Sequence, residues 1–145
     1  MNCIFFGHRD CDDLNSERLR NAIENMIRQG VYTFYVGHQG RFDQTVFASL
    51  LQLKEIYPQI EISVVLAYLP TQKSECDLYH GYSIYPEGIE LGLPKFAIER
   101  RNKWMIDRAD YCLCWIDHTW GGAYKFVQMA KRRGVMIMNL GRADL

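Results

Sequence analysis

The sequence predicts an α/β domain in which a mainly parallel sheet of five strands is covered by helices on both faces. Short, almost continuously apolar runs alternate with longer runs whose apolar residues recur at helical spacing. Glycine-marked turns follow three of the apolar runs, at residues 7–9, 37–43 and 121–122. The length of 145 residues suits one unit with a substantial core. Residues 1–145 are therefore predicted to form a single domain.

The first half reads as strand, helix, strand, helix, strand. Strands are expected at residues 2–6, 31–36 and 61–66. The first helix ends before Gly30, and the second covers residues 44–57 and ends at Tyr57-Pro58. The residues that form the two apolar stripes are Leu19, Ala22, Ile23, Met26 and Ile27 in the first helix and Val46, Phe47, Leu50 and Leu51 in the second.

The second half continues the alternation after Pro94. A helix follows that proline, residues 111–116 form a strand, a helix over about 123–133 ends at Gly134, and residues 135–140 form the last strand. Strands that are apolar throughout are typical of parallel sheets buried on both faces. In such sheets, ligands bind at the carboxyl ends of the strands, near the reversal in strand order. The glycine turns lie at those ends.

Residues 68–93 interrupt the pattern and are predicted to form one long tyrosine-rich loop. Loops of this length in compact domains are commonly lids or binding loops, and the tyrosines suit a binding role. An equally good interpretation is aromatic packing that covers a sheet edge or forms a dimer contact.

Composition narrows the class of partner. The formal net charge is zero and the basic residues are scattered, which argues against an extended nucleic-acid footprint and favours a small ligand. The five cysteines lack the spacing of a zinc site or a disulfide framework, which predicts a reduced, cytoplasmic protein. No apolar run is long enough to cross a bilayer, and Met1 leads into a strand without a signal-like segment, so no membrane association is expected.

The glycine turns predict an anion site. Glycine lets the backbone pass close to a ligand, Asp43 is placed to cap the second helix, and exposed N–H groups at a helix start carry partial positive charge. Arginine forks match phosphate oxygens, and Asn102 suits contact with a base or ribose. The predicted ligand-binding residues are Gly7, His8, Arg9, Gly37, His38, Gln39, Gly40, Arg41, Phe42, Asp43, Arg101, Asn102, Gly121 and Gly122.

Each of these residues also has a purely structural interpretation. Glycines commonly punctuate α/β folds, and surface arginines are often only solvated. His8, His38 and His118 all follow predicted strands, where they could bind a metal, act as acid or base, or, for His8 and His38, donate hydrogen bonds to a ligand or to neighbouring turns. Their spacing does not match a metal site, so no metal is expected, and no cofactor is expected either. Cys112 and Cys114 share one face of a strand, where buried thiols are usually inert.

Four motifs in order resemble the SLOG superfamily: Gly7-His8-Arg9, the segment 37–43, the segment RNKWMID at 101–107, and Gly121-Gly122. The resemblance covers nearly the whole chain, and it is closest to the small stand-alone YpsA-related branch. It implies a Rossmann-like fold that binds nucleotides or nucleotide-derived signals, and it implies self-association. The superfamily includes lonely-guy phosphoribohydrolases, DNA-processing proteins and sensors in antiphage systems.

One departure from the phosphoribohydrolases bears on activity. Their glycine-rich stretch is followed by a glutamate that serves the glycosidic chemistry, whereas here Gly121-Gly122 leads into residues 123–128 without a carboxylate. The leading hypothesis is therefore a sensor or sequestering protein for an ADP-ribose-like or cyclic nucleotide. The alternatives are a nucleotide N-glycosidase that uses Asp43, Glu99 or Asp117, and a protein-interaction module.

Overall fold

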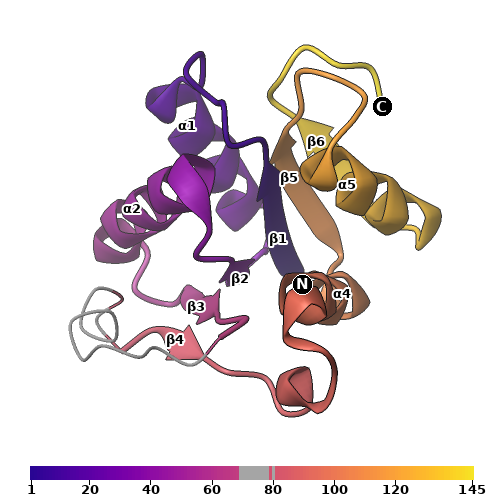
Figure 1. Cartoon of the computed structure of the whole chain (residues 1–145). Coiled ribbons are helices and arrows are strands. Elements are labelled where there is room, and N and C mark those ends of the chain that lie inside the picture. The colour runs from indigo at the N-terminus through magenta and orange to yellow at the C-terminus, as the bar shows by residue number, and fades with distance from the viewer. Residues whose placement is uncertain (69–78, 80) are drawn as a thin grey trace.

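The computed structural model describes residues 1–68, 79 and 81–145. The described chain is an α/β fold with a six-strand, all-parallel sheet and a Rossmann-like arrangement (Figure 1). The strands are β1 (Asn2–Gly7), β2 (Thr33–Val36), β3 (Glu61–Val65), β4 (Ser83–Ile84), β5 (Tyr111–Trp115) and β6 (Met136–Asn139). The helices are α1 (Ser16–Arg28), α2 (Gly40–Ile56), α4 (Ala97–Arg108) and α5 (Gly122–Arg132), with short 3-10 turns η1 (Ile89–Leu91) and η2 (Pro94–Phe96).

The strand order is β4-β3-β2-β1-β5-β6, so the chain builds outward from β1 in one direction and then returns to build in the other. The reversal falls between β1 and β5, whose register pairs Gly7 with Trp115 at their carboxyl ends. A crevice outside this point is where α/β sheets of this kind bind ligands.

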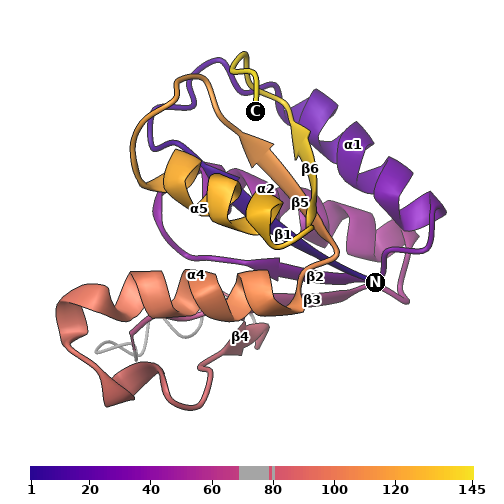
Figure 2. The same ribbon diagram turned by 90° about the vertical axis from the view of Figure 1, so that its right-hand side faces the viewer.

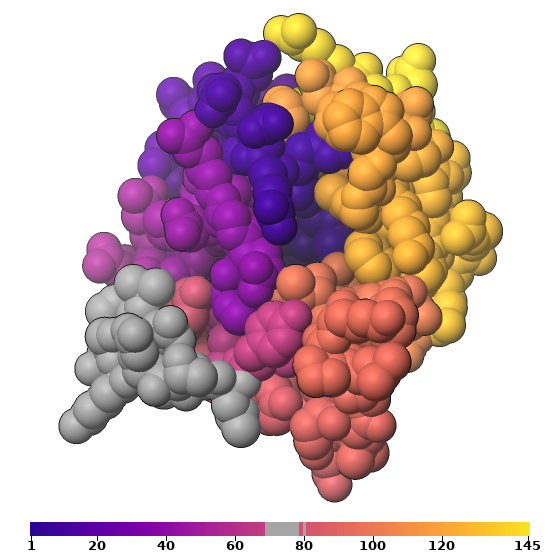
Figure 3. All heavy atoms as spheres, viewed as in Figure 1, coloured from indigo at the N-terminus to yellow at the C-terminus, as the bar shows by residue number. Residues whose placement is uncertain are grey.

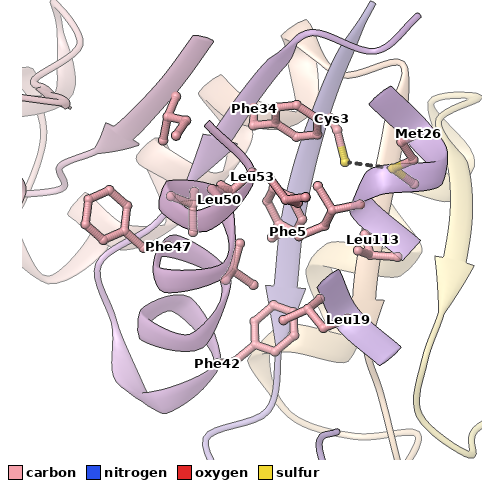
Figure 4. Packing of buried hydrophobic residues seen from close by; sticks show 14 of the residues in the cluster. Cys3, Phe5, Leu19, Met26, Phe34, Phe42, Phe47, Leu50, Leu53 and Leu113 are labelled. Carbon is pink, nitrogen blue, oxygen red and sulfur yellow. Dashed lines mark hydrogen bonds between the residues drawn. The ribbon is translucent and has the colours of Figure 1, made fainter. Parts of the chain in front are cut away.

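The helices cover both faces of the sheet, as predicted. Helices α1 and α2 lie on one side and α4 and α5 on the other, which a quarter turn of the molecule shows clearly (Figure 2). Side chains of β1 alternate between the two layers: Cys3 and Phe5 belong to the core under α1 and α2, and Ile4 and Phe6 to the core under α4 and α5. Figure 4 shows Phe5 enclosed by side chains of α1 and α2.

Local signals explain where α1 begins and ends. The side chain of Asn15 accepts hydrogen bonds from the backbone N–H groups of Glu17 and Arg18, which satisfies two donors that the helix start would leave unpaired. Beyond the helix, Gly30 adopts a left-handed backbone with φ 98°, which other residues rarely tolerate.

Two predictions about elements were wrong. The sheet has six strands and not five, because Ser83 and Ile84 of the predicted loop pair in parallel with Val64 and Val65. Two residues are too few for an alternating pattern to show. The second helix begins at Gly40 and not at residue 44, because the Asp43 carboxylate reaches back to accept from the N–H of Gln39 and Phe42 packs into the core.

The predicted loop 68–93 falls partly outside the described residues, since 69–78 and 80 are not described. Within the described part, Tyr79 and Tyr82 pack edge-on against Phe47 of α2, with ring centroids 5.6 and 6.1 Å from it. These tyrosines therefore extend the core on the α2 side of the sheet.

Candidate ligand-binding site

A cleft of about 470 Å³ opens at the carboxyl ends of β1 and β2, between α4 and the start of α5. Figure 3 shows the hollow at the centre of the face, with indigo atoms from the start of the chain at its bottom. Its volume lies within the range of small-molecule sites. The residues that line it are Phe5, Phe6, Gly7, His8, Arg9, Asp10, Gly37, Gln39, Asp43, Ile98, Arg101, Asn102, Met105, His118, Trp120, Gly121, Gly122, Ala123 and Phe126.

The cleft brings together residues that are far apart in the sequence. Three predicted glycine turns meet there, one after β1, one after β2 and one before α5. The predicted site residues that line it are Gly7, His8, Arg9, Gly37, Gln39, Asp43, Arg101, Asn102, Gly121 and Gly122.

Four predicted site residues lie outside the lining. Phe42 is a core residue, 1 % exposed, and its ring occupies the space where Gly7 lacks a side chain. Arg41 points away to pair with the exposed carboxylate of Asp12. His38 bonds to the backbone behind the cleft, and Gly40 starts α2 with φ 83°. Their contacts in the structure are to the protein itself.

Asp43 and Arg101 meet at Gly37 on the wall of the cleft. A β-carbon on Gly37 would lie 2.7 Å from Oδ2 of Asp43 and 2.8 Å from Nη1 of Arg101, so both side chains lie against this glycine. Both are buried, and Oδ2 of Asp43 also accepts from the backbone N–H of Gln39 at 2.9 Å. The wall thus combines an acid and a cation with little access to water.

Burial is the largest influence on the pKa values of Asp43 and Arg101. It raises the pKa of Asp43 to about 6, against the lowering effects of the Arg101 charge and the Gln39 hydrogen bond. Burial also lowers the pKa of Arg101, while the charge of Asp43 raises it. Arg101 stays a cation because its ordinary pKa is so high. Asp43 is therefore a carboxyl that exchanges its proton near neutral pH.

Arg101 is held in place by two hydrogen bonds. Its Nε donates to Oδ1 of Asn102 at 2.7 Å, and its Nη1 donates to the carbonyl of Val65 at the end of β3 at 3.1 Å. These bonds fix the guanidinium between α4 and the sheet. The cation is therefore preorganised before any ligand arrives.

His38 supports the same wall from behind. Its Nε2 accepts from the backbone N–H of Ala67 at 3.1 Å, which requires the unprotonated nitrogen. Burial, and then the charge of Arg101, lower the pKa of His38 to about 4. The ring is neutral at pH 7 and anchors the turn after β2 to the turn after β3.

Three aromatic rings that line the cleft form a stack, which we call the ring stack: His8, His118 and Trp120. His8 and His118 lie 3.6 Å apart between centroids and His118 and Trp120 lie 3.7 Å apart, with interplanar angles of 15° and 19°. The edge of His8 contacts Trp115 of the core at 6.0 Å. The stack runs from the core out to the surface.

The N-terminus of α5 completes the cleft. Gly121 has φ 94° and Gly122 begins the helix, and a β-carbon on Gly122 would meet no atom within 4 Å. The space beside Gly122 is thus open, and the dipole of the 11-residue helix favours negative charge at this end of the helix.

Sequence reasoning missed several lining residues, chiefly Trp120. A tryptophan next to the glycine pair was a usable signal, since an apolar core position is improbable inside a turn. His118 was considered from the sequence only as a metal ligand or an acid/base histidine. Among the described residues, no group of three or more His, Cys, Asp or Glu side chains is placed to hold a metal ion.

Of the other carboxylates, Asp10 lines the cleft, whereas Glu99 and Asp117 lie outside the lining. Glu99 pairs with Lys103 and Lys125 outside the lining, and Asp117 is exposed. Burial raises the pKa of the Cys3 thiol, which lies in the core. In the part of the chain that the structure describes, no helix is long and apolar enough to span a membrane.

Comparison with known proteins does not assign this chain to a family. No protein-family model matches the chain, and no curated protein matches it significantly. Function is therefore inferred from the geometry of the cleft.

Proposed function

We propose that the protein binds a nucleotide or nucleotide-derived ligand, ADP-ribose-like or cyclic, in the cleft at the carboxyl ends of β1 and β2. The observation that carries the proposal is the position of the open Gly121-Gly122 turn. It lies at the reversal of strand order, at the start of a helix, and on the wall of a cleft of about 470 Å³. That combination suits a phosphate attached to a larger organic group.

The phosphate would accept hydrogen bonds from the N–H groups at the start of α5. Arg9, which is exposed and lines the cleft, would supply a mobile counter-charge. Arg101 is too firmly held to follow a ligand, so it would contribute a fixed positive field from the opposite wall. The two arginines thus have different roles.

Sugar hydroxyls need polar partners of fixed geometry, and Asn102 and Gln39 supply them. The Oδ1 atom of Asn102 accepts from Arg101, which directs its amide NH₂ group to other acceptors. Gln39 lines the cleft at the start of α2. Phe6, Met105 and Phe126 line the cleft as apolar surface. This balance of apolar surface with a few placed polar groups is typical of cofactor-sized sites.

Thermal unfolding against a ligand panel tests the proposal. The panel would hold AMP, ADP-ribose, NAD, a cyclic dinucleotide and ribose 5-phosphate, and mass spectrometry would follow each incubation. A ligand present at 100 times its dissociation constant stabilises the folded protein by about 2.7 kcal/mol, which raises the midpoint by several degrees. Absence of any shift across the panel at millimolar concentration would contradict the proposal.

Two exposed arginines give a matched pair of variants. Arg9→Ala removes a charge from the cleft, whereas Arg41→Ala removes one that pairs with Asp12 outside it. Both side chains are at the surface, so both variants should fold with nearly unchanged stability. The shift caused by a phosphate-bearing ligand should shrink in Arg9→Ala and persist in Arg41→Ala. Equal loss in both would point to a general charge effect.

A second candidate function is hydrolysis of the N-glycosidic bond of a nucleotide, and Asp43 is the observation that favours it. A carboxyl in a cleft with a pKa of about 6 can exchange a proton with the water or the leaving base at neutral pH. Of the carboxylates weighed from the sequence, Asp43 lines the cleft, and Glu99 and Asp117 do not. Cleavage would release free base and a ribosyl phosphate.

The two candidates are separated by the fate of the ligand. Chromatography of AMP incubated with the protein would show free adenine in the second case and intact AMP in the first. Asp43→Asn should abolish adenine release while leaving AMP binding within a few-fold of wild type. Release that survives in this variant would remove Asp43 from the chemistry.

A further inference from the structure

Trp120 is an exposed aromatic residue that also stacks on a neighbouring ring. It is 68 % exposed, yet one face of its ring lies 3.7 Å from the ring of His118. Trp120 also helps to line the cleft. Exposure of a large apolar ring to water is unfavourable, and a planar group bound against the ring would remove part of that exposed surface.

His118 contacts both the ring and the backbone of Trp120. Nδ1 of His118 lies 3.0 Å from the carbonyl oxygen of Trp120, and His118 in turn stacks on the buried His8. The chain then turns sharply at Gly121, with φ 94°. The indole is therefore positioned before binding, so little rotamer freedom would be lost on contact with a ligand.

His8, at the inner end of the ring stack, gives a second and independent indication of a ligand in the cleft. His8 is 6 % exposed, lines the cleft, and among the described residues no hydrogen bond reaches its Nε2 atom. Buried polar atoms normally have partners, and an unpaired one calls for an explanation. A polar group of a ligand lying in the cleft would supply the partner.

Position in the chain links the stack to the proposed phosphate site. Gly122 follows Trp120 by two residues, a span of at most about 7 Å. One ligand with a planar ring and a phosphate joined by a short linker can therefore contact both. A nucleoside monophosphate unit has this construction.

Resting on the proposed function, we propose that the outer face of Trp120 is the stacking surface for the nucleobase of the ligand. The ring stack would then recognise an aromatic base by its flat face, with the phosphate at Gly121-Gly122. Stacking of this kind tolerates any base, because every base has a flat π face. The site would thus select nucleotides over sugar phosphates while discriminating weakly among bases.

AMP and ribose 5-phosphate are the probes, because they share the sugar phosphate and only AMP carries a base. Calorimetric titration of the full chain should show AMP binding at least about tenfold more tightly, which corresponds to about 1.4 kcal/mol or more. Trp120→Ala should lower AMP affinity toward that of ribose 5-phosphate and leave ribose 5-phosphate unchanged. Trp120→Phe should retain most of the AMP advantage.

Two controls separate stacking from other effects. Arg9→Ala should weaken both probes by the same factor, since it acts on the shared phosphate. Binding of AMP should also quench tryptophan emission, and this change should persist in Trp104→Phe, because Trp104 packs against Tyr35 and Arg108 away from the cleft. It should disappear in Trp120→Phe.

The outcomes distinguish this inference from the proposed function. Equal affinity of wild type for AMP and ribose 5-phosphate would overturn base stacking while leaving phosphate binding in place. A parallel loss of both probes in Trp120→Ala would also overturn it, since the residue would then serve the turn and not the base. Absence of binding by either probe would contradict both proposals together.

Discussion

Asp43 and Arg101 both lie against the position where Gly37 lacks a side chain, and each is buried. The carboxylate is tied to Gln39 at the start of α2, and the guanidinium is tied to Val65 at the end of β3. The pair therefore couples the first turn of a helix to a neighbouring strand through one glycine.

Gly37→Ala should lower the free energy of unfolding by about 1–3 kcal/mol, the usual cost of adding a methyl group to a packed site. The new β-carbon would lie 2.7 Å from Asp43 and 2.8 Å from Arg101, and both neighbours are held by hydrogen bonds. Urea denaturation measures the change.

Gly122→Ala is the matched control, because its β-carbon would meet no atom within 4 Å. Its stability should stay the same or rise by up to about 1 kcal/mol, since alanine restricts the unfolded chain. If a phosphate-bearing ligand uses this turn, the variant should nevertheless bind it less well. Equal destabilisation of both glycine variants would show that the crowding at Gly37 is not specific.

Asp43 should make the protein less stable as pH rises. Its pKa is about 6 in the folded state against an ordinary 3.8, so between these values the folded state binds more protons than the unfolded state. The free energy of unfolding therefore falls by about 3 kcal/mol across this window from this group alone. Denaturation of Asp43→Asn and wild type should be compared at pH 4, 5, 6 and 7. The stability of the variant relative to wild type should rise by about this amount from the lowest to the highest pH. A constant difference would mean that Asp43 has an ordinary pKa.

His38 should make the protein more stable as pH rises, over nearly the same pH range in which Asp43 makes it less stable. Its folded pKa is about 4 against 6.5, so the unfolded state binds more protons between these values and stability rises with pH. In His38→Gln, which keeps an acceptor for the N–H of Ala67, the stability relative to wild type should fall by about 2–3 kcal/mol from pH 4 to pH 7, allowing for partial exposure. In wild type the two effects should largely cancel. The same denaturation series checks both variants.

Sequence reasoning predicted that the glycine turns meet at one edge of the sheet, but it did not predict which of their neighbours line the cleft. Glycines after apolar runs identify turns, and the parallel alternation brings those turns to one edge of the sheet, so Gly7, Gly37 and Gly121 were found. Which neighbours of a glycine face inward depends on packing that no spacing reveals. Phe42 fills the space beside Gly7, while Arg41, one residue earlier, faces solvent and Asp12.

Two other features lay beyond sequence reasoning for different reasons. The edge strand β4 comprises Ser83 and Ile84, too short for any periodicity. The ring stack joins His8, after β1, to His118 and Trp120, which follow β5. These segments meet only because β5 returns to lie beside β1, so the order of the strands had to be known first.

Arg101→Met should destabilise the protein by several kcal/mol at pH 7, because it removes the hydrogen bonds to Val65 and Asn102 and leaves the buried Asp43 carboxylate without the favourable charge of Arg101. The loss should be smaller at pH 4, where Asp43 is already protonated. The double variant Asp43→Asn with Arg101→Met should recover part of the loss, with a coupling energy of about 0.5–3 kcal/mol at pH 7 that shrinks at pH 4. Arg41→Met, at an exposed ion pair, serves as the control and should change stability by less than about 1 kcal/mol. Coupling that does not vary with pH would mean that Arg101 stabilises the fold through its hydrogen bonds to Val65 and Asn102 and not through the charge of Asp43.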